Sequence, residues 1–309
     1  MTLAVAALAV AACGGDDGGS GSDGTALRQA LARLEATSAT SQHISFGDAA
    51  RIDEASGGTF KGTWGSLTGW GADQLYPYRE QLPDVLGIDL VASESLISVG
   101  QPPHVVSLIE GGQDADEITA AATASGWSGD PVLTLEMDPS QPVSVSAPNV
   151  QPVGSDAVVG GQSADLSVVD SGETSLADAP VIGELADCLG DVVAAQFIQA
   201  DPYPTGLGVR PDEDDPDTPV SVLCTMTTSV SDGERLAAEM DEAVTSGESA
   251  LVSRPYADYF TNPDVEILEG EHIVRMEVTH TPDASAITIF QMAATRDLTG
   301  LAVEMPSLN

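Results

Sequence analysis

The densest group of candidate ligand atoms in the sequence is the acidic run from Asp212 to Asp217, which reads DEDDPD. Carboxylate oxygens are the ligands that calcium prefers in proteins, so this run could hold a hard cation. It departs from the EF-hand pattern, because the sixth position is Asp217 rather than Gly and the twelfth is Leu223 rather than Glu. A solvated loop is therefore the preferred interpretation, and a weak calcium site over 212–217 is kept as an alternative.

Histidine and serine side chains are a second group of candidate metal-binding or catalytic residues. His272 and His280 fall an even number of positions apart on one expected strand, so their side chains share a face. Their companions on that face are Val274, Met276 and Val278, which predicts a core face rather than a metal site. The chain lacks a GxSxG nucleophile elbow. We therefore assign no catalytic residue, no metal and no cofactor, and keep a secreted hydrolase with a spatially assembled Ser-His-Asp triad as an alternative.

Aromatic side chains form a third candidate group. They make up only 4% of the chain, yet Trp64, Trp70, Tyr76 and Tyr78 fall close together in one Gly-rich stretch. Rings with a polar edge suit ligand contact as well as packing. This group is our preferred binding surface, and the alternative is that the rings fill a small core.

Strands and helices must position these groups. Residues 57–71 are rich in Gly and predict an irregular loop. Hydrophobic spacing and capping residues predict helices at 26–36, 76–87, 114–126, 163–170, 180–191, 231–247 and 285–298. Alternation and short apolar runs predict a short strand leading into a turn over 43–53, and strands near 95–99, 104–112, 132–137, 149–161, 192–200, 220–229 and 264–280.

An internal repeat organises these elements. The order strand, helix, hairpin, helix occurs once from His104 and again from Val220. Chance likeness between generic segments is the alternative. The pattern predicts an α+β protein with two similar subdomains, each an antiparallel sheet with helices on one face. The expected boundaries are 25–200 for the first subdomain, 201–219 for an acidic, Pro-rich surface loop, and 220–309 for the second.

The N-terminus has the character of an export signal. An apolar run from Leu3 to Ala12 ends in Val10, two alanines and Cys13. About ten apolar residues are too few to span a bilayer, which needs about twenty. The stretch resembles a bacterial lipoprotein signal and lipobox, although the usual positively charged start is missing; an earlier start would supply it. The GGDDGGSGSDG segment that follows is typical of a flexible tether.

This resemblance implies a cellular location for the protein. Residues 1–12 would be removed, a diacylglycerol carrying chains such as palmitate would be joined to the Cys13 sulfur, and residues 13–24 would form the tether. The mature protein would sit on the extracytoplasmic face of the cell membrane. Together with the acidic composition, the pattern looks like lipoproteins of high-GC Gram-positive bacteria. The likeness covers residues 1–24 only.

The excess of acidic residues disfavours some classes of binding partner. The chain has 48 Asp plus Glu against 10 Lys plus Arg, a formal charge of -38, and Lys61 is its only lysine. Nucleic acid is disfavoured, because binding it requires Lys and Arg to displace counterions from phosphates. Anionic lipid headgroups are disfavoured for the same reason, so the membrane partnership would depend on the lipid.

The other two cysteines predict a disulfide. Cys188 and Cys224 form an even pair, and the export resemblance places them where oxidation is permitted. A metal pair or two buried thiols are the alternatives, but the chain has no CxxC spacing to favour a metal. Together these observations predict a non-catalytic envelope lipoprotein that binds an envelope protein or a small ligand.

Overall fold

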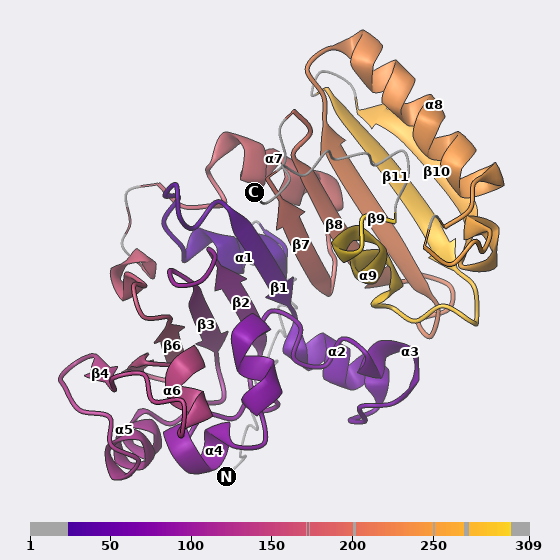
Figure 1. The fold of residues 1–309 in the computed structure, drawn as a ribbon. Helices are drawn as coiled ribbons and strands as arrows, with labels where there is room; N and C mark the ends of the chain where they lie inside the picture. The colour runs from indigo at the N-terminus through magenta and orange to yellow at the C-terminus, as the bar shows by residue number, and fades with distance from the viewer. Residues whose placement is uncertain are drawn as a thin grey trace, which may run out of the picture.

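One continuous antiparallel sheet dominates the protein (Figure 1). The computed structural model describes residues 24–170, 172, 174–199, 202–249, 251–268 and 272–297. Their strands form an 11-stranded sheet in the order β10-β11-β9-β8-β7-β1-β2-β3-β6-β5-β4. The α+β class is thereby confirmed. The predicted signal peptide 1–12, Cys13 and the rest of the tether up to residue 23 lie outside the described residues.

Each half of the chain contributes one side of this sheet. The elements of the first half are α1 (Ala26–Ala32), β1 (His43–Gly47), α2 (Ala49–Ser56), α3 (Gly62–Gly65), η1 (Asp73–Tyr78), α4 (Leu82–Leu86), β2 (Ser95–Val99), β3 (Val106–Glu110), α5 (Ala115–Ala124), β4 (Leu133–Thr134), α6 (Pro142–Ser146), β5 (Asn149–Val153), β6 (Asp156–Gly160) and η2 (Leu166–Val168). Those of the second half are α7 (Pro180–Leu189), β7 (Ala194–Ile198), β8 (Thr205–Pro211), β9 (Pro219–Met226), α8 (Val230–Ser246), η3 (Tyr256–Asp258), β10 (Phe260–Leu268), β11 (Ile273–His280) and α9 (Thr288–Ala294).

The main elements repeat in the same order in both halves. The first runs α1-β1-β2-β3-α5-β5-β6 and the second runs α7-β7-β8-β9-α8-β10-β11. The order within the sheet also matches, as β1-β2-β3-β6-β5 and β7-β8-β9-β11-β10. The strands of the two halves join where β1 pairs with β7, with Ser45 opposite Gln196. The shared order begins at α1 and α7, upstream of the predicted starts at His104 and Val220. A common origin of the halves stays a prediction.

One face of the sheet is covered at its centre by α1 and α7. Their buried residues have the same spacing, with apolar side chains at the first, fourth, fifth and eighth positions of each set. These residues are Leu27, Ala30, Leu31 and Leu34 in and after α1, and Ile182, Leu185, Ala186 and Leu189 in α7. The two helices therefore bury equivalent stripes against the sheet.

Two separate cores lie on the opposite face. Helices α8 and α9 pack on the strands of the second half, while α4, α5 and α6 pack on those of the first. The long connection between β1 and β2 joins the two cores, because Ile52, Trp64 and Leu67 belong to one and Leu75 to the other. The Gly-rich stretch passes close to the sheet on this face. A Cβ built on Gly71, whose φ is 89°, would lie 2.2 Å from the Leu96 carbonyl oxygen.

The predicted surface loop 201–219 is in part a strand. Residues Thr205–Pro211 form β8, whose first five positions are buried between β7 and β9. Gly206 and Gly208 in this strand let the end of α7 and the residues after it approach the sheet. A Cβ on Gly206 would lie 3.2 Å from Leu189 at the end of α7, and one on Gly208 would lie 3.3 Å from Leu189 and 2.7 Å from Val192, which follows the helix. The exposed acidic loop is confined to the turn between β8 and β9.

Several element boundaries differ from the sequence prediction. The helix predicted at 163–170 is only the short η2, and the helix predicted at 76–87 is divided between η1 and α4. The helix predicted at 26–36 ends at Ala32, because Leu34 and Glu35 form bridges with Val169 and Ser175. The strand predicted at 132–137 shrinks to β4, two residues long. Ser229 rather than Ser231 caps α8, since its hydroxyl accepts the Asp232 N–H.

Candidate functional site

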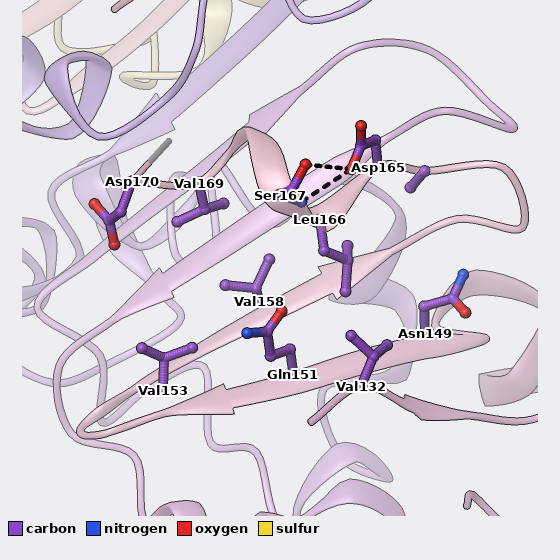
Figure 2. Close-up of a pocket in the computed structure, with 11 residues that line it drawn as sticks. Val132, Asn149, Gln151, Val153, Val158, Asp165, Leu166, Ser167, Val169 and Asp170 are labelled. Atoms are coloured by element: carbon purple, nitrogen blue, oxygen red, sulfur yellow. Dashed lines mark hydrogen bonds between the residues drawn. The ribbon is translucent and has the colours of Figure 1, made fainter. Parts of the chain in front are cut away.

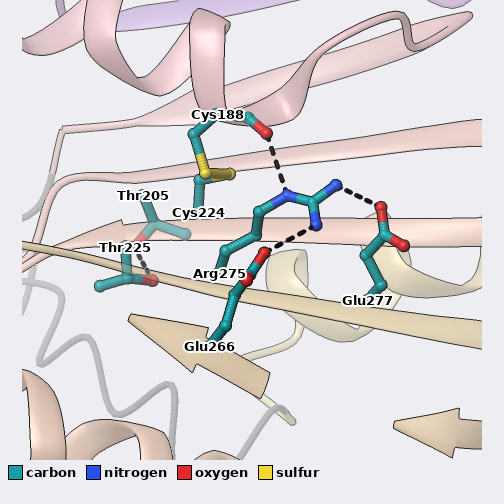
Figure 3. Close-up of a disulfide and its surroundings, with 7 residues drawn as sticks. All are labelled: Cys188, Thr205, Cys224, Thr225, Glu266, Arg275 and Glu277. Carbon is teal, nitrogen blue, oxygen red and sulfur yellow. Dashed lines mark hydrogen bonds and ion pairs between the residues drawn. A yellow bond between two sulfur atoms is a disulfide. The ribbon is translucent and has the colours of Figure 1, made fainter. Parts of the chain in front are cut away.

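The predicted disulfide joins α7 to the sheet (Figure 3). Cys188 near the end of α7 is bonded to Cys224 in β9, 36 residues further along the chain. The disulfide is confirmed, and Cys224 is fully buried. Arg275 of β11 lies beside it and donates from Nε to the Cys188 carbonyl oxygen at 3.2 Å. The Arg275 guanidinium also pairs with Glu266 and Glu277, so this connection extends to β10 and β11.

The first half makes the corresponding connection with charges. Arg33 stands six positions after Leu27, as Cys188 stands six positions after Ile182. Its guanidinium lies 2.9 Å from Glu110 of β3 and 2.7 Å from Asp156 of β6. Because β3 matches β9 and β6 matches β11 in the shared order, an ion-pair cluster occupies the place of the disulfide and Arg275.

Arg33 also fixes the segment that follows β6. It binds both carboxylate oxygens of Asp170, with Nε to Oδ1 at 3.1 Å and Nη2 to Oδ2 at 2.8 Å. This bidentate pair lowers the pKa of Asp170, because the guanidinium stabilises the ionised carboxylate. The segment from 164 to 170 is thereby held across one face of the sheet.

A groove opens between this segment and the strands beneath it (Figure 2). We call it the β5–β6 groove, and its volume is about 490 Å³. It is lined by Val132, Asn149, Gln151, Val153, Val158, Ala164, Asp165, Leu166, Ser167, Val169 and Asp170. Sequence reasoning missed this site. Its only sequence signal is the alternation of β5, which puts Asn149, Gln151 and Val153 on one face.

Most polar groups of the groove have assigned partners. Asn149 donates to the Gly161 carbonyl oxygen at 2.7 Å, and Asp165 Oδ1 accepts from the N–H and hydroxyl of Ser167 at 3.1 and 2.7 Å. The Gln151 amide has no hydrogen bond to the described part of the chain. Figure 2 shows it near the middle of the groove, with Leu166 and Val158 above it. The groove thus offers an apolar surface with one free amide.

The aromatic group predicted as a binding surface divides between the two cores. Trp64 is 2% exposed and donates to the Pro216 carbonyl oxygen at 3.1 Å. Trp70 donates to the Ala195 carbonyl oxygen at 3.1 Å and stacks on Phe290 with ring centroids 4.4 Å apart. Tyr76 and Tyr78 pack instead against the first-half core. None of the four lines the β5–β6 groove, and their placement favours a role in packing.

The structure places Ser221 and His280 in contact, as in a Ser-His pair. Ser285 offers a carbonyl oxygen 3.1 Å from His280 Nδ1, so Nδ1 carries the proton and the Ser221 hydroxyl donates to Nε2 at 2.7 Å. Burial lowers the pKa of His280 to about 4. Ser221 is fully buried and His280 is 3% exposed, so a substrate has no path to the hydroxyl. His272 lies exposed before β11, away from this pair.

The acidic run between β8 and β9 is folded on itself. Asp212 Oδ1 accepts the N–H groups of Asp214 and Asp215 at 2.9 and 3.1 Å, and Asp215 accepts the Thr218 hydroxyl at 2.8 Å. Across the described residues, no group of three or more His, Cys, Asp or Glu side chains is placed to hold a metal ion. The structure therefore adds nothing to the calcium alternative.

No known protein family matches this chain. Neither protein-family models, nor curated proteins, nor solved structures match the chain significantly. Within the described residues, no helix combines the length and the apolar character needed to cross a membrane. The groove and the two connections of α1 and α7 to the sheet are thus the features on which a function can be argued.

Proposed function

We propose that this protein is a non-catalytic binding module, held at the extracytoplasmic face of the cell membrane by lipid on Cys13, and that it binds a small ligand in the β5–β6 groove. The groove carries the proposal. Its volume of about 490 Å³ is in the range of small-molecule sites. Aliphatic side chains and a free Gln151 amide supply the mixed lining that such sites use. The burial of the Ser221–His280 pair supports binding over hydrolysis.

Filling the groove should abolish ligand binding. We expect a screen of the full chain against envelope metabolites, peptides and glycans to yield compounds that raise its melting temperature. In the Gln151→Trp variant, the indole ring occupies the groove, so the same compounds should no longer shift the transition. Thr119→Trp, on the exposed face of α5, is the matched control and should respond as the wild type does. Compounds that shift both Trp variants equally would place binding elsewhere.

The lipid anchor is tested separately. When the full chain is expressed in a Gram-positive host fed with a clickable palmitate analogue, we expect the wild type to be labelled and to sediment with membranes. Cys13→Ala removes the sulfur that would carry the lipid, so this variant should be unlabelled and released from the membrane fraction. A membrane-bound, labelled Cys13→Ala protein would contradict anchoring through this residue.

A further inference from the structure

We infer that the β5–β6 groove selects a small organic cation with an aliphatic body, such as an alkylammonium ion, over the corresponding alcohol or acid. This inference rests on the proposed binding function of the groove and names the class of ligand. Its basis is the juxtaposition of an apolar channel with a single unneutralised carboxylate, that of Asp165.

The charges on the groove are all negative. Among the described residues that line it, only Asp165 and Asp170 carry a charge. Asp170 is already neutralised, because both of its oxygens bind Arg33. Asp165 differs, since only its Oδ1 is engaged, by Ser167, and Oδ2 has no partner within the described chain. A ligand cation would therefore meet a free carboxylate oxygen at Asp165.

The space next to Asp165 suits an aliphatic chain. Figure 2 shows Asp165 and Asp170 toward opposite ends of the segment that borders the groove, with Leu166 between them and Val158 beneath. Val153 continues the apolar surface and is 38% exposed, so it has area left to bury. Covering this surface with methylene groups is favourable by roughly 25 cal/mol per Å².

The rest of the molecule favours the same sign of ligand charge. The formal charge of the chain is -38, so its surface potential concentrates cations and repels anions. A carboxylate placed in the groove would face Asp165, and none of the described lining residues is a cation that could receive it. The Gln151 amide oxygen could accept a hydrogen bond from an ammonium group that lies further into the groove.

Three probes that share a six-carbon chain distinguish the effect of ligand charge on binding from the effect of ligand shape. Hexylamine, hexan-1-ol and hexanoate are titrated into the full chain at neutral pH, and binding is followed by the NMR signals of the Gln151 amide and the Val153 and Val158 methyl groups. We expect hexylamine to bind about threefold more tightly than hexan-1-ol, as an ion pair with the exposed Asp165 carboxylate allows. Hexanoate should bind more weakly than the alcohol.

Two variants locate the source of the selectivity. Asp165→Asn keeps an oxygen that can accept from Ser167 but removes the charge, so most of the preference for the amine over the alcohol should be lost, leaving only the part due to the net charge of the chain. Asp116→Asn removes one charge from the exposed face of α5 and should keep the wild-type preference. An amine preference that Asp165→Asn leaves as large as in the wild type, or equal binding of amine and alcohol by the wild type, overturns the inference.

The design separates this inference from the function on which it rests. If all three probes shift the groove signals equally, cation selection is wrong while the groove remains a binding site. If none of them shifts these signals, the inference fails, and the proposed function is decided by whether Gln151→Trp abolishes the shifts found in the ligand screen.

Discussion

Replacing Cys188 and Cys224 together with Ala is expected to lower the free energy of unfolding by about 4 kcal/mol. The bond closes a loop over a sequence separation of 36 residues, and its loss frees that loop in the unfolded chain. Urea denaturation of the full-length double variant, followed by circular dichroism, measures the change.

The chain supplies a control for this measurement. Cys13 is the third cysteine and takes no part in the bond, so Cys13→Ala should leave the unfolding transition in place. Reducing the wild type should reproduce the loss seen in the double variant. A double variant within about 1 kcal/mol of the wild type would show that the contacts of α7 with the sheet hold without the bond.

Acid is expected to destabilise the protein through His280. The pKa of His280 is about 4 in the folded state, against 6.5 for a histidine in water, so the unfolded state takes up the proton first. This contribution to stability is complete above pH 6.5, is lost progressively as the pH falls towards 4, and changes no further below that. The shift corresponds to a loss of about 3 kcal/mol.

A double variant isolates this contribution. His280→Phe combined with Ser221→Ala removes the titrating ring and the hydroxyl that bonds to it, so no buried donor is left without a partner. The stability of this variant should fall less steeply between pH 6.5 and 4 than that of the wild type. His104→Phe, at an exposed position, should keep the wild-type slope. Equal slopes in all three proteins would assign the acid sensitivity to carboxylates instead.

Local sequence signals predicted part of the fold. The cap at Asp114 and the proline that begins α7 fixed two helices, and the cysteine count predicted the disulfide. Strand β8 was missed because the prolines and the acidic run of 201–219 predict a surface loop, whereas Gly206 in this strand lets α7 pack closely on the sheet. The aromatic group was adjacent in sequence but divides between two cores, which only the path of the β1–β2 connection decides.

The groove could not be predicted for a related reason. Its floor is a hairpin that the sequence does indicate, but its other wall is the segment from Ala164 to Asp170. Where that segment crosses the sheet depends on Arg33, a residue far away in the chain, binding Asp170. Periodicity indicates which face of an element is apolar, but it cannot predict an ion pair between residues that are far apart in the chain.

The two connections from α1 and α7 to the sheet make the halves sensitive to different surroundings. In the first half, Arg33 with Glu110 and Asp156 forms a partly exposed ionic connection, which dissolved salt weakens by screening. In the second half, Cys188 and Cys224 form a covalent connection that salt leaves intact and a reductant opens. Within one continuous sheet, the connection in the first half thus weakens as ionic strength rises, and the connection in the second half opens as the redox potential becomes reducing.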